Sequence, residues 1–315
     1  RYSLPLVVVI TNAEVFLEVF LGICQVVLRL GGHHAPPRYL NLPLVACITR
    51  TLGHHDLNRQ TFPASVFSHR RCWPALTSMA DELSPIEIIA KGRWDNALFT
   101  TYALSLTFFE THIIKNCLVK TGCRNIWVVA DVDGYQQSLA ERQSARVGQE
   151  YHLVPVALSN GVFHPKCSYL SGPDGDLLMV SSGNLTFGGF GRNVEVIEMF
   201  HSRQNPGIFR QFAEFLQALD ERKDFLNPDR RWISTFADMA QKVGLAQAFV
   251  GPDLPRLIHC ATESVFDQIK SVFNGSGGAA RLKVLSPFYD AQAGAMQALA
   301  KEAKYSVILL WELKA

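Results

Sequence analysis

The chain has 315 residues, of which 48% are hydrophobic and 18% charged, enough for two ordinary domains or one large α/β domain with additions. This composition excludes a mainly disordered chain, and a formal net charge of +2 excludes a strong overall basic field. The seven cysteines include no C-x-x-C pair, which argues against a zinc ribbon or a disulfide scaffold. Their odd number favours reduced thiols in a cytoplasmic protein.

The first 78 residues differ in composition from the rest of the chain. They hold seven arginines, no lysine, five of the ten histidines and three acidic residues, whereas the remainder carries 23 basic and 25 acidic groups. Met79 then opens Met-Ala-Asp-Glu-Leu, which reads like an ordinary bacterial protein start. We therefore expect residues 1–78 to be a doubtful segment, either upstream or mis-framed translation or an accessory region, with the protein proper starting at Met79.

Two features of this first segment do not predict function. The apolar stretch from Leu4 to Leu28 contains Glu14 and Glu18, and a central carboxylate costs about 2.5–3.5 kcal/mol in a membrane-spanning helix. The histidine pairs at 33–34 and 54–55 are chain neighbours, whose side chains point in different directions on a helix or strand. We expect neither a membrane span nor a metal site there.

From Met79 onward, strand patterns alternate with helix patterns. The near-continuous apolar run at 125–131 is typical of a buried parallel strand, and the turn-rich stretch 171–176 predicts a hairpin loop. Strands are expected over residues 97–106, 125–131, 151–157, 164–170, 177–182 and 194–200, and helices over residues 108–120, 135–146 and 206–222. This alternation predicts an α/β fold with a mixed sheet flanked by helices.

The C-terminal part has the same order of elements as the beginning of this unit. Helical patterns around 232–248 and 262–273 are followed by a strand at 281–289, a helix at 291–304 and a strand at 305–311. We expect a first repeat over residues 79–225, a helical linking region over 226–280, and the start of a truncated second repeat over 281–315.

The residues that carry chemistry lie in two short segments. In a strand, His164 and Lys166 project from one face, and Ser182 and Asn184 are likewise two residues apart at the end of the return strand. A hairpin brings the two pairs side by side. Lysine and asparagine bind phosphate oxygens and an imidazole attacks phosphorus, while Glu195 is suited to hydrogen-bond the other ring nitrogen and select the attacking tautomer.

This pattern resembles the phospholipase D superfamily, whose signature is H-x-K, an aspartate shortly after it, then G-S-x-N and a downstream acidic residue. The resemblance covers about residues 95–200. It implies that His164 is the nucleophile, that Lys166, Ser182 and Asn184 bind the phosphate, and that Glu195 orients a histidine. The runs Phe-His-Pro-Lys, Gly-Asn-Leu-Thr-Phe-Gly-Gly and Asn-Val-Glu are most similar to the bacterial nuclease-type branch, which includes restriction-enzyme and helicase-associated members.

The resemblance implies an α/β/α sandwich and a metal-independent phosphodiesterase without a cofactor. The expected substrate is nucleic acid, DNA rather than RNA, cleaved through a phosphohistidine on His164, with no membrane partner. A second histidine would protonate the leaving group, supplied by a second motif in a missing C-terminal half or in a homodimer. Two alternatives stay open: a phospholipid hydrolase or transphosphatidylase, and a catalytically inactive nucleic-acid-binding module of a helicase or restriction system.

The sequence departs from the family pattern at two positions. Ser171 stands where the aspartate is expected, and Ser181 replaces the usual glycine. Asp174 and Asp176 are candidates for the missing carboxylate, but both have the character of turn residues. Cys167, beside Lys166, is expected to face the core rather than to act as a reactive thiol.

Overall fold

A computed structural model describes five long stretches of the chain and several short ones. The long stretches are residues 84–141, 146–159, 161–193, 195–245 and 255–275. The short ones are residues 7–10, 16–17, 25–28, 281–286 and 305–310, with a few positions between 294 and 301.

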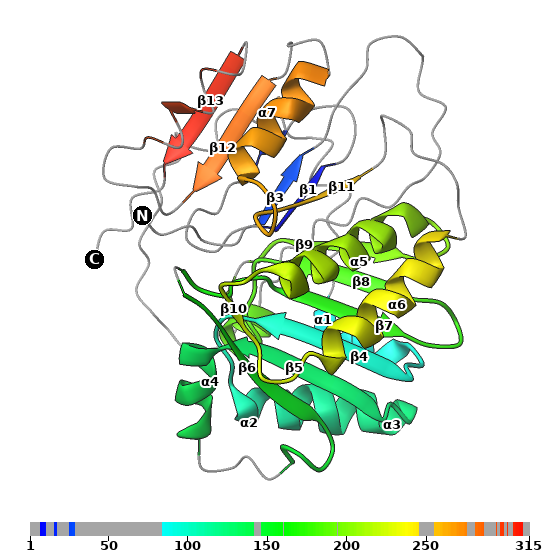
Figure 1. The fold of residues 1–315 in the computed structure, drawn as a ribbon. Helices are drawn as coiled ribbons and strands as arrows, with labels where there is room; N and C mark the ends of the chain where they lie inside the picture. The colour runs from blue at the N-terminus through cyan, green and yellow to red at the C-terminus, as the bar shows by residue number, and fades with distance from the viewer. Residues whose placement is uncertain are drawn as a thin grey trace, which may run out of the picture.

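A seven-stranded mixed sheet is the centre of the described fold (Figure 1). Its middle strands β6, β5 and β4 are parallel, β7, β8 and β9 continue from β4 as an antiparallel meander, and β10 pairs antiparallel with β6. In spatial order the strands are β10 (Phe225–Leu226), β6 (His152–Leu158), β5 (Asn125–Asp131), β4 (Asn96–Thr101), β7 (Cys167–Ser171), β8 (Leu177–Ser181) and β9 (Ile197–His201).

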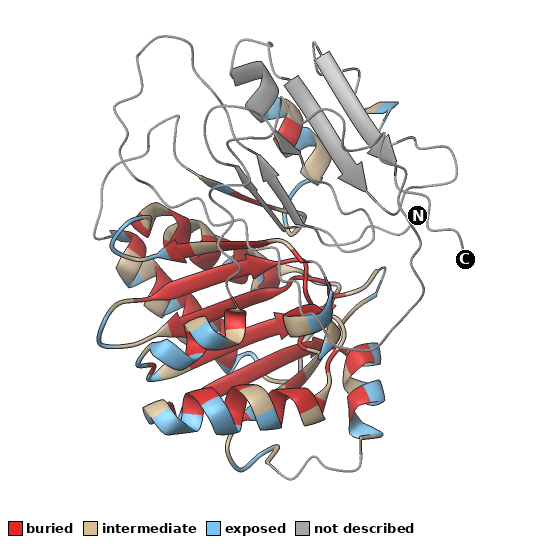
Figure 2. Cartoon of the chain, turned by 180° about the vertical axis from the view of Figure 1, so that it is seen from behind, coloured by how far each residue is buried: buried red, intermediate tan, exposed pale blue. Residues whose placement is uncertain are grey.

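Helices cover both faces of this sheet (Figures 1 and 2). Leu98 of β4 belongs to the core shared with α5 and α6, whereas its neighbour Phe99 belongs to the core shared with α1 and η2, because successive strand residues point to opposite faces. The helices are α1 (Pro85–Lys91), α2 (Leu106–Phe108), the π-helix η2 (Phe109–Leu118), α3 (Val119–Thr121), α4 (Val132–Leu139), α5 (Pro206–Glu221) and α6 (Arg231–Leu245). The predicted α/β class, with a mixed sheet flanked by helices, is confirmed.

The elements with the clearest apolar patterns were predicted well. Strand β5 has the predicted bounds, and it is buried on both faces because Trp127 and Val129 enter one core while Val128 enters the other. Helix α5 buries the apolar face expected of it, and each such large side chain contributes about 1.5–3 kcal/mol to stability. That face consists of Ile208, Phe212, Phe215, Leu216 and Leu219, all at most 2% exposed.

The strands next to the chemistry are shorter than predicted. Strand β7 begins only at Cys167, because Pro165 has no N–H to donate to a ladder, so His164 and Lys166 precede the strand. Strand β8 ends at Ser181, which leaves Ser182 in the following loop. Strand β9 likewise begins after Glu195, at Ile197.

Two further predicted boundaries, of one strand and one helix, differ from those in the structure, and a helix-capping residue explains each difference. The strand expected over 97–106 ends at Thr101, because Ser105 accepts a hydrogen bond from the Phe108 N–H and starts a helix. The helix expected over 135–146 is α4, which starts at Val132 because the Asp131 carboxylate caps it and ends at Leu139.

The remaining strands form two three-stranded sheets, of order β11-β1-β3 and β13-β12-β2. Strands β12 and β13 are parallel neighbours, as β4 and β5 are, and α7 (Val265–Gly275) lies in the expected linking region. The helix expected over 291–304 falls mostly outside the described residues, and the second repeat stays a prediction. The strands are β11 (Arg256–His259), β1 (Val7–Ile10), β3 (Gln25–Leu28), β13 (Tyr305–Leu310), β12 (Arg281–Ser286) and β2 (Phe16–Leu17).

The short strands β1, β2 and β3 come from the first 78 residues, where β1 pairs with β11 and β2 pairs with β12. Most of that segment lies outside the described residues, so its origin stays a prediction. In the part of the chain that was described, no helix has the length and apolar content needed to cross a membrane.

Gly122 allows a test of how the long helix on one face of the sheet ends. Its φ is +85°, and a Cβ added there meets nothing within 4 Å, so only the left-handed backbone opposes a side chain. We expect Gly122→Ala to lower the free energy of unfolding in urea by about 1–2 kcal/mol. Gly207→Ala is the matched control, since it also has open space but no positive φ, and it is expected to be neutral or slightly stabilising. Equal effects of the two variants would contradict this account.

Candidate active site

The candidate site lies at one edge of the seven-stranded sheet. The carboxyl ends of the parallel strands β4, β5 and β6 meet there, together with the start of β7, the end of β8 and the start of β9. The segments that follow or precede these strand ends carry His164, Lys166, Ser182, Asn184 and Glu195. The edge of an open α/β sheet at the carboxyl ends of its strands is where such folds bind ligands.

The segment that carries the histidine is irregular and is held by side chains of neighbouring strands. The Phe163 N–H donates to the Asp131 carboxylate at 2.6 Å, and the Cys167 N–H donates to the Thr100 hydroxyl at 2.9 Å. The Lys166 carbonyl accepts from the Ser181 N–H at 2.9 Å. These bonds attach both ends of the His-Pro-Lys segment to β4, β5 and β8. The pKa of Asp131 is raised by burial, while hydrogen bonds from the Phe163 and Asp133 N–H groups oppose the rise.

His164 is buried between an ammonium group and an aromatic ring. Lys166 Nζ lies 2.8 Å from Nδ1 and 3.0 Å from Nε2 of the imidazole, and the Tyr102 ring centroid lies 5.1 Å from the His164 ring. His164 is 5% exposed and Lys166 is 3% exposed. Burial, and after it the charge of Lys166, lowers the pKa of His164 to about 3. At neutral pH the imidazole is therefore uncharged, the state in which a ring nitrogen is a nucleophile.

Glu195 is bonded to Ser182 rather than to His164. The Ser182 hydroxyl donates to one carboxylate oxygen and the Asn193 amide donates to the other at 3.3 Å, while Ser182 itself accepts from the Val196 N–H at 3.0 Å. Burial raises the pKa of Glu195, and these hydrogen bonds oppose the rise. The expected hydrogen bond between the histidine ring and the Glu195 carboxylate is absent between these described residues.

Asn184 has one polar atom engaged and one available. Its carboxamide oxygen accepts from the Ala103 N–H at 3.1 Å and lies 3.3 Å from the Thr101 hydroxyl, so it fastens the loop after β8 to the end of β4. Its amide nitrogen has no partner among the described residues, and the side chain is half-buried. This N–H₂ group is thus suited to bind an anionic oxygen.

Two glycines pack the loop that contains Ser182 and Asn184 against the following π-helical turn, η3 (Gly188–Arg192). A Cβ on Gly183 would lie 2.2 Å from the Gly189 carbonyl, and one on Gly189 would lie 2.2 Å from the Asn184 carbonyl. No side chain fits between the two backbones, so the turn and the loop form one packed unit. The run of glycines is a packing device and not a phosphate-binding loop of G-x-G-x-x-G type.

The departures from the family pattern have separate structural explanations. Ser181 is buried, and its hydroxyl accepts from the Gly183 N–H at 2.8 Å, which tightens the turn before Asn184. Ser171 lies at the far end of β7 from His164, where its hydroxyl bonds Asp176. Asp176 also bonds the Tyr169 hydroxyl, and Asp174 forms a surface ion pair with Arg93 at 2.7 Å. Neither aspartate lies at the candidate site.

Sequence reasoning missed three residues that shape the site. Thr100 and Asp131 hold the backbone of the His-Pro-Lys segment, and Tyr102 packs against its histidine. A usable signal existed for Asp131, which ends the strand predicted over 125–131. Thr100 and Tyr102 fall inside the strand predicted over 97–106, whose end at Thr101 became visible only in the structure. Cys167 is confirmed as a core residue at 1% exposure, and burial raises the pKa of its thiol to about 12.

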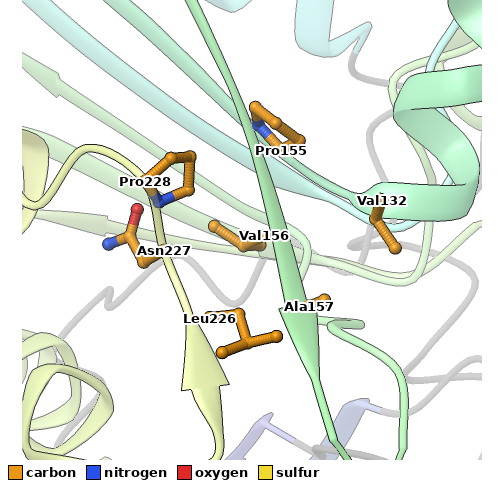
Figure 3. A pocket seen from close by; sticks show the side chains of 7 residues that line it. All are labelled: Val132, Pro155, Val156, Ala157, Leu226, Asn227 and Pro228. Atoms are coloured by element: carbon orange, nitrogen blue, oxygen red, sulfur yellow. The ribbon is translucent and has the colours of Figure 1, made fainter.

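An open depression of about 410 Å³ lies at the same edge of the sheet, beyond β5, and contains none of the predicted site residues. Its lining is almost wholly apolar, and Asn227 is the one polar side chain in it (Figure 3). The seven residues are Val132, Pro155, Val156, Ala157, Leu226, Asn227 and Pro228. It offers neither a nucleophile nor a charged group, so the group of residues around His164 is the stronger candidate for an active site.

The polar groups of the candidate site are an ammonium, hydroxyls, a carboxamide and the carboxylates of Glu195 and Asp131. Both carboxylates already accept hydrogen bonds from the protein, so the set suits a phosphate better than a divalent cation. Within the described stretches, no group of three or more His, Cys, Asp or Glu side chains is arranged to hold a metal ion.

Comparison with known proteins gives structural likeness only. No family model matches the chain, and no curated protein matches it. Among solved structures, it is similar to NucT from Helicobacter pylori, at 14% identity and a TM-score of 0.28, over 50% of this chain and 83% of that one. It is also similar to a yeast tyrosyl-DNA phosphodiesterase variant, at 12% identity and a TM-score of 0.35, over 49% of this chain and 36% of that one. A third is polyphosphate kinase from Porphyromonas gingivalis, at 10% identity and a TM-score of 0.32, over 51% of this chain and 26% of that one.

The close packing of Gly189 predicts a large effect of one methyl group. In Gly189→Ala the new Cβ would lie 2.2 Å and 2.5 Å from the backbone oxygen and nitrogen of Asn184, so the loop must shift. We expect the free energy of unfolding to fall by about 1–3 kcal/mol. Gly191→Ala, in the same turn, meets nothing within 4 Å and is expected to change stability by less than about 0.5 kcal/mol. Chemical denaturation of both variants checks this, and a neutral Gly189→Ala would contradict it.

The lowered pKa of His164 predicts an acid-sensitive contribution to stability. Below pH 6.5 the unfolded chain binds a proton at this residue, but the folded chain does so only near pH 3. The free energy of unfolding therefore falls as the pH is lowered through this window, by up to about 1.4 kcal/mol per pH unit. His164→Gln should give a shallower pH dependence between these limits. Burial also lowers the pKa of His259, to about 4. This histidine contributes equally to the pH dependence of the unchanged protein and of the His164→Gln variant. Identical slopes would contradict the assignment.

Proposed function

We propose that this protein is a metal-independent phosphodiesterase that cleaves nucleic acid through a covalent intermediate on His164. The observation that carries this proposal is a buried imidazole, uncharged at neutral pH, with the Lys166 ammonium 2.8 Å and 3.0 Å from its ring nitrogens. Such a pair supplies a nucleophile and a positive charge for the phosphate that it attacks.

In the first step, a ring nitrogen of His164 forms a bond to phosphorus and the bond from phosphorus to the leaving oxygen breaks. Lys166 moves from the ring to a non-bridging oxygen, and the free amide of Asn184 binds another. A general acid protonates the leaving oxygen. In the second step, water attacks the phosphohistidine, gives up a proton to the same group, now a base, and releases the product phosphate with His164 restored. Ser182 and Glu195 support the phosphate-binding loop.

The general acid has to be a group other than His164, which is needed uncharged as the nucleophile. Within the described part of the chain, no second histidine contacts the His164 ring. We propose that a second motif supplies it, either from a C-terminal half beyond these residues or from a second copy of this chain. A pseudo-twofold or true twofold arrangement would place two such edges face to face.

Nucleic acid is favoured over phospholipid by the exposed surface. The large hydrophobic side chains exposed in the described residues are scattered over different elements and form no amphipathic basic helix of the kind that binds a membrane surface. They are Val119, Leu139, Phe187, Leu226 and Leu245.

The test is hydrolysis of bis(4-nitrophenyl) phosphate and of end-labelled oligonucleotides in excess EDTA. We expect turnover with EDTA, a loss of at least about 1,000-fold in His164→Ala, and a phosphorylated protein trapped by an alkaline quench. His201→Ala is the matched control, because this histidine lies at the end of β9 farthest from the site and is exposed.

Loss of activity in EDTA with rescue by Mg²⁺ would contradict the proposed mechanism. Light scattering on the same samples measures the molar mass. A monomer with full, His164-dependent turnover would contradict the need for a second motif.

A further inference from the structure

We propose that Phe187 and Arg192 form a platform that binds a single-stranded polynucleotide next to the scissile phosphate. This inference rests on the proposed function and names the form of its substrate. The two residues lie at the start and the end of the glycine-rich turn after Asn184, and we call them the Phe187–Arg192 platform. The Arg192 guanidinium carbon lies 5.8 Å from the centroid of the Phe187 ring.

The platform is rigidly supported from within the fold. The Phe187 ring contacts Phe108 edge-on at a centroid distance of 5.3 Å, and it contacts His112 at 5.3 Å in the same manner. Phe108 is 2% exposed, and His112 stacks on it at 5.2 Å. An aromatic ring held in this way loses little conformational freedom on binding, so a base stacks on it at low entropic cost.

Both members of the platform are open to a ligand. Phe187 is 38% exposed although its ring packs against two other aromatic rings. Arg192 is exposed, and it takes part in none of the ion pairs formed among the described residues. An unpaired guanidinium over an aromatic ring offers a planar surface for a base and N–H groups for a phosphate.

The platform is connected directly to the candidate active site. The backbones of Gly189 and Asn184 are packed too closely for a side chain, so the turn cannot move apart from the phosphate-binding loop. At its other end, Arg192 is followed by Asn193, whose amide donates to Glu195 at 3.3 Å. A strand bound on the platform would therefore be held in a defined position relative to His164.

The chemistry of the platform fits a single strand better than a duplex. Stacking on a protein side chain needs a base whose face is free, and in a duplex both faces are covered by neighbouring bases. One aromatic ring and one arginine form no set of hydrogen bonds that would distinguish one base from another. We therefore expect binding to depend little on the nucleotide sequence. DNA and RNA single strands share this chemistry.

The test measures binding of fluorescein-labelled dT and rU oligonucleotides by anisotropy, using phosphorothioate backbones and the full 315-residue chain. We expect Phe187→Leu to raise the Kd about tenfold, in the range of about 5- to 150-fold that one base stack provides. Arg192→Gln should weaken binding and reduce the slope of log K against log salt by about 0.7, the value for one phosphate contact on a single strand. A duplex of the same length should bind more weakly than either strand, and tighter binding to dT or to rU identifies the preferred polymer.

Arg124→Gln is the matched control, since Arg124 is an exposed arginine without an ion pair at the opposite edge of the sheet, just before β5. It removes the same charge and is expected to leave Kd within about twofold, because exposed charges beyond about 10 Å are screened at 0.1 M salt. Thermal unfolding of each variant confirms an intact fold.

Unchanged binding by Phe187→Leu and Arg192→Gln, an equal loss in Arg124→Gln, or duplex binding as tight as single-strand binding would each overturn the proposal. If no phosphodiester is cleaved but the two platform variants still lose binding, the platform is supported and the catalytic proposal alone fails. If cleavage is His164-dependent and both variants cleave and bind normally, the catalytic proposal stands and the platform is refuted.

Discussion

The segment around His164 is buried but is not part of a strand, so its backbone N–H groups need side-chain hydrogen-bond partners. The rest of the site depends on the residues that supply them. A buried N–H left unpaired costs about 1–3 kcal/mol, so an irregular segment in a core needs partners. Asp131 and Thr100, at the ends of β5 and β4, supply them at 2.6 Å and 2.9 Å. Because both partners belong to the central parallel strands, the position of the histidine is set by the most buried part of the sheet.

Burial then determines the charge state of the groups at this edge. It lowers the pKa of His164 and raises that of Glu195, while hydrogen bonds partly oppose the rise at the carboxylate. Lys166 is the charged group nearest the imidazole, and it discourages protonation of the ring. The same environment strengthens attraction between the lysine and an incoming phosphate, because little water screens it. An uncharged imidazole beside a cation is thus a consequence of where the sheet places the segment.

Close packing extends this organisation from the histidine to the surface. Gly183 and Gly189 let the loop after β8, which carries Asn184, pack directly on the following turn, which carries the exposed Phe187 and Arg192. Asn184 ties this loop to the end of β4, and Tyr102, just after β4, packs against the His164 ring. The proposed chemistry and the proposed strand-binding surface therefore share one support, which favours a fixed distance between them.

The fold class and the elements with continuous apolar patterns, such as β5 and α5, followed from the sequence alone, as did five of the polar residues at the candidate site: His164, Lys166, Ser182, Asn184 and Glu195. Those features are local, because periodicity and residue type are properties of neighbouring positions. Only the tertiary structure decided which groups meet. Asp131 and Phe163 are 32 residues apart and Thr100 and Cys167 are 67 apart, and they touch because β4 lies between β5 and β7 in the sheet. The same holds for Glu195, whose partner is Ser182 because the end of β8 adjoins the start of β9, a neighbour relation that spacing along the chain does not encode.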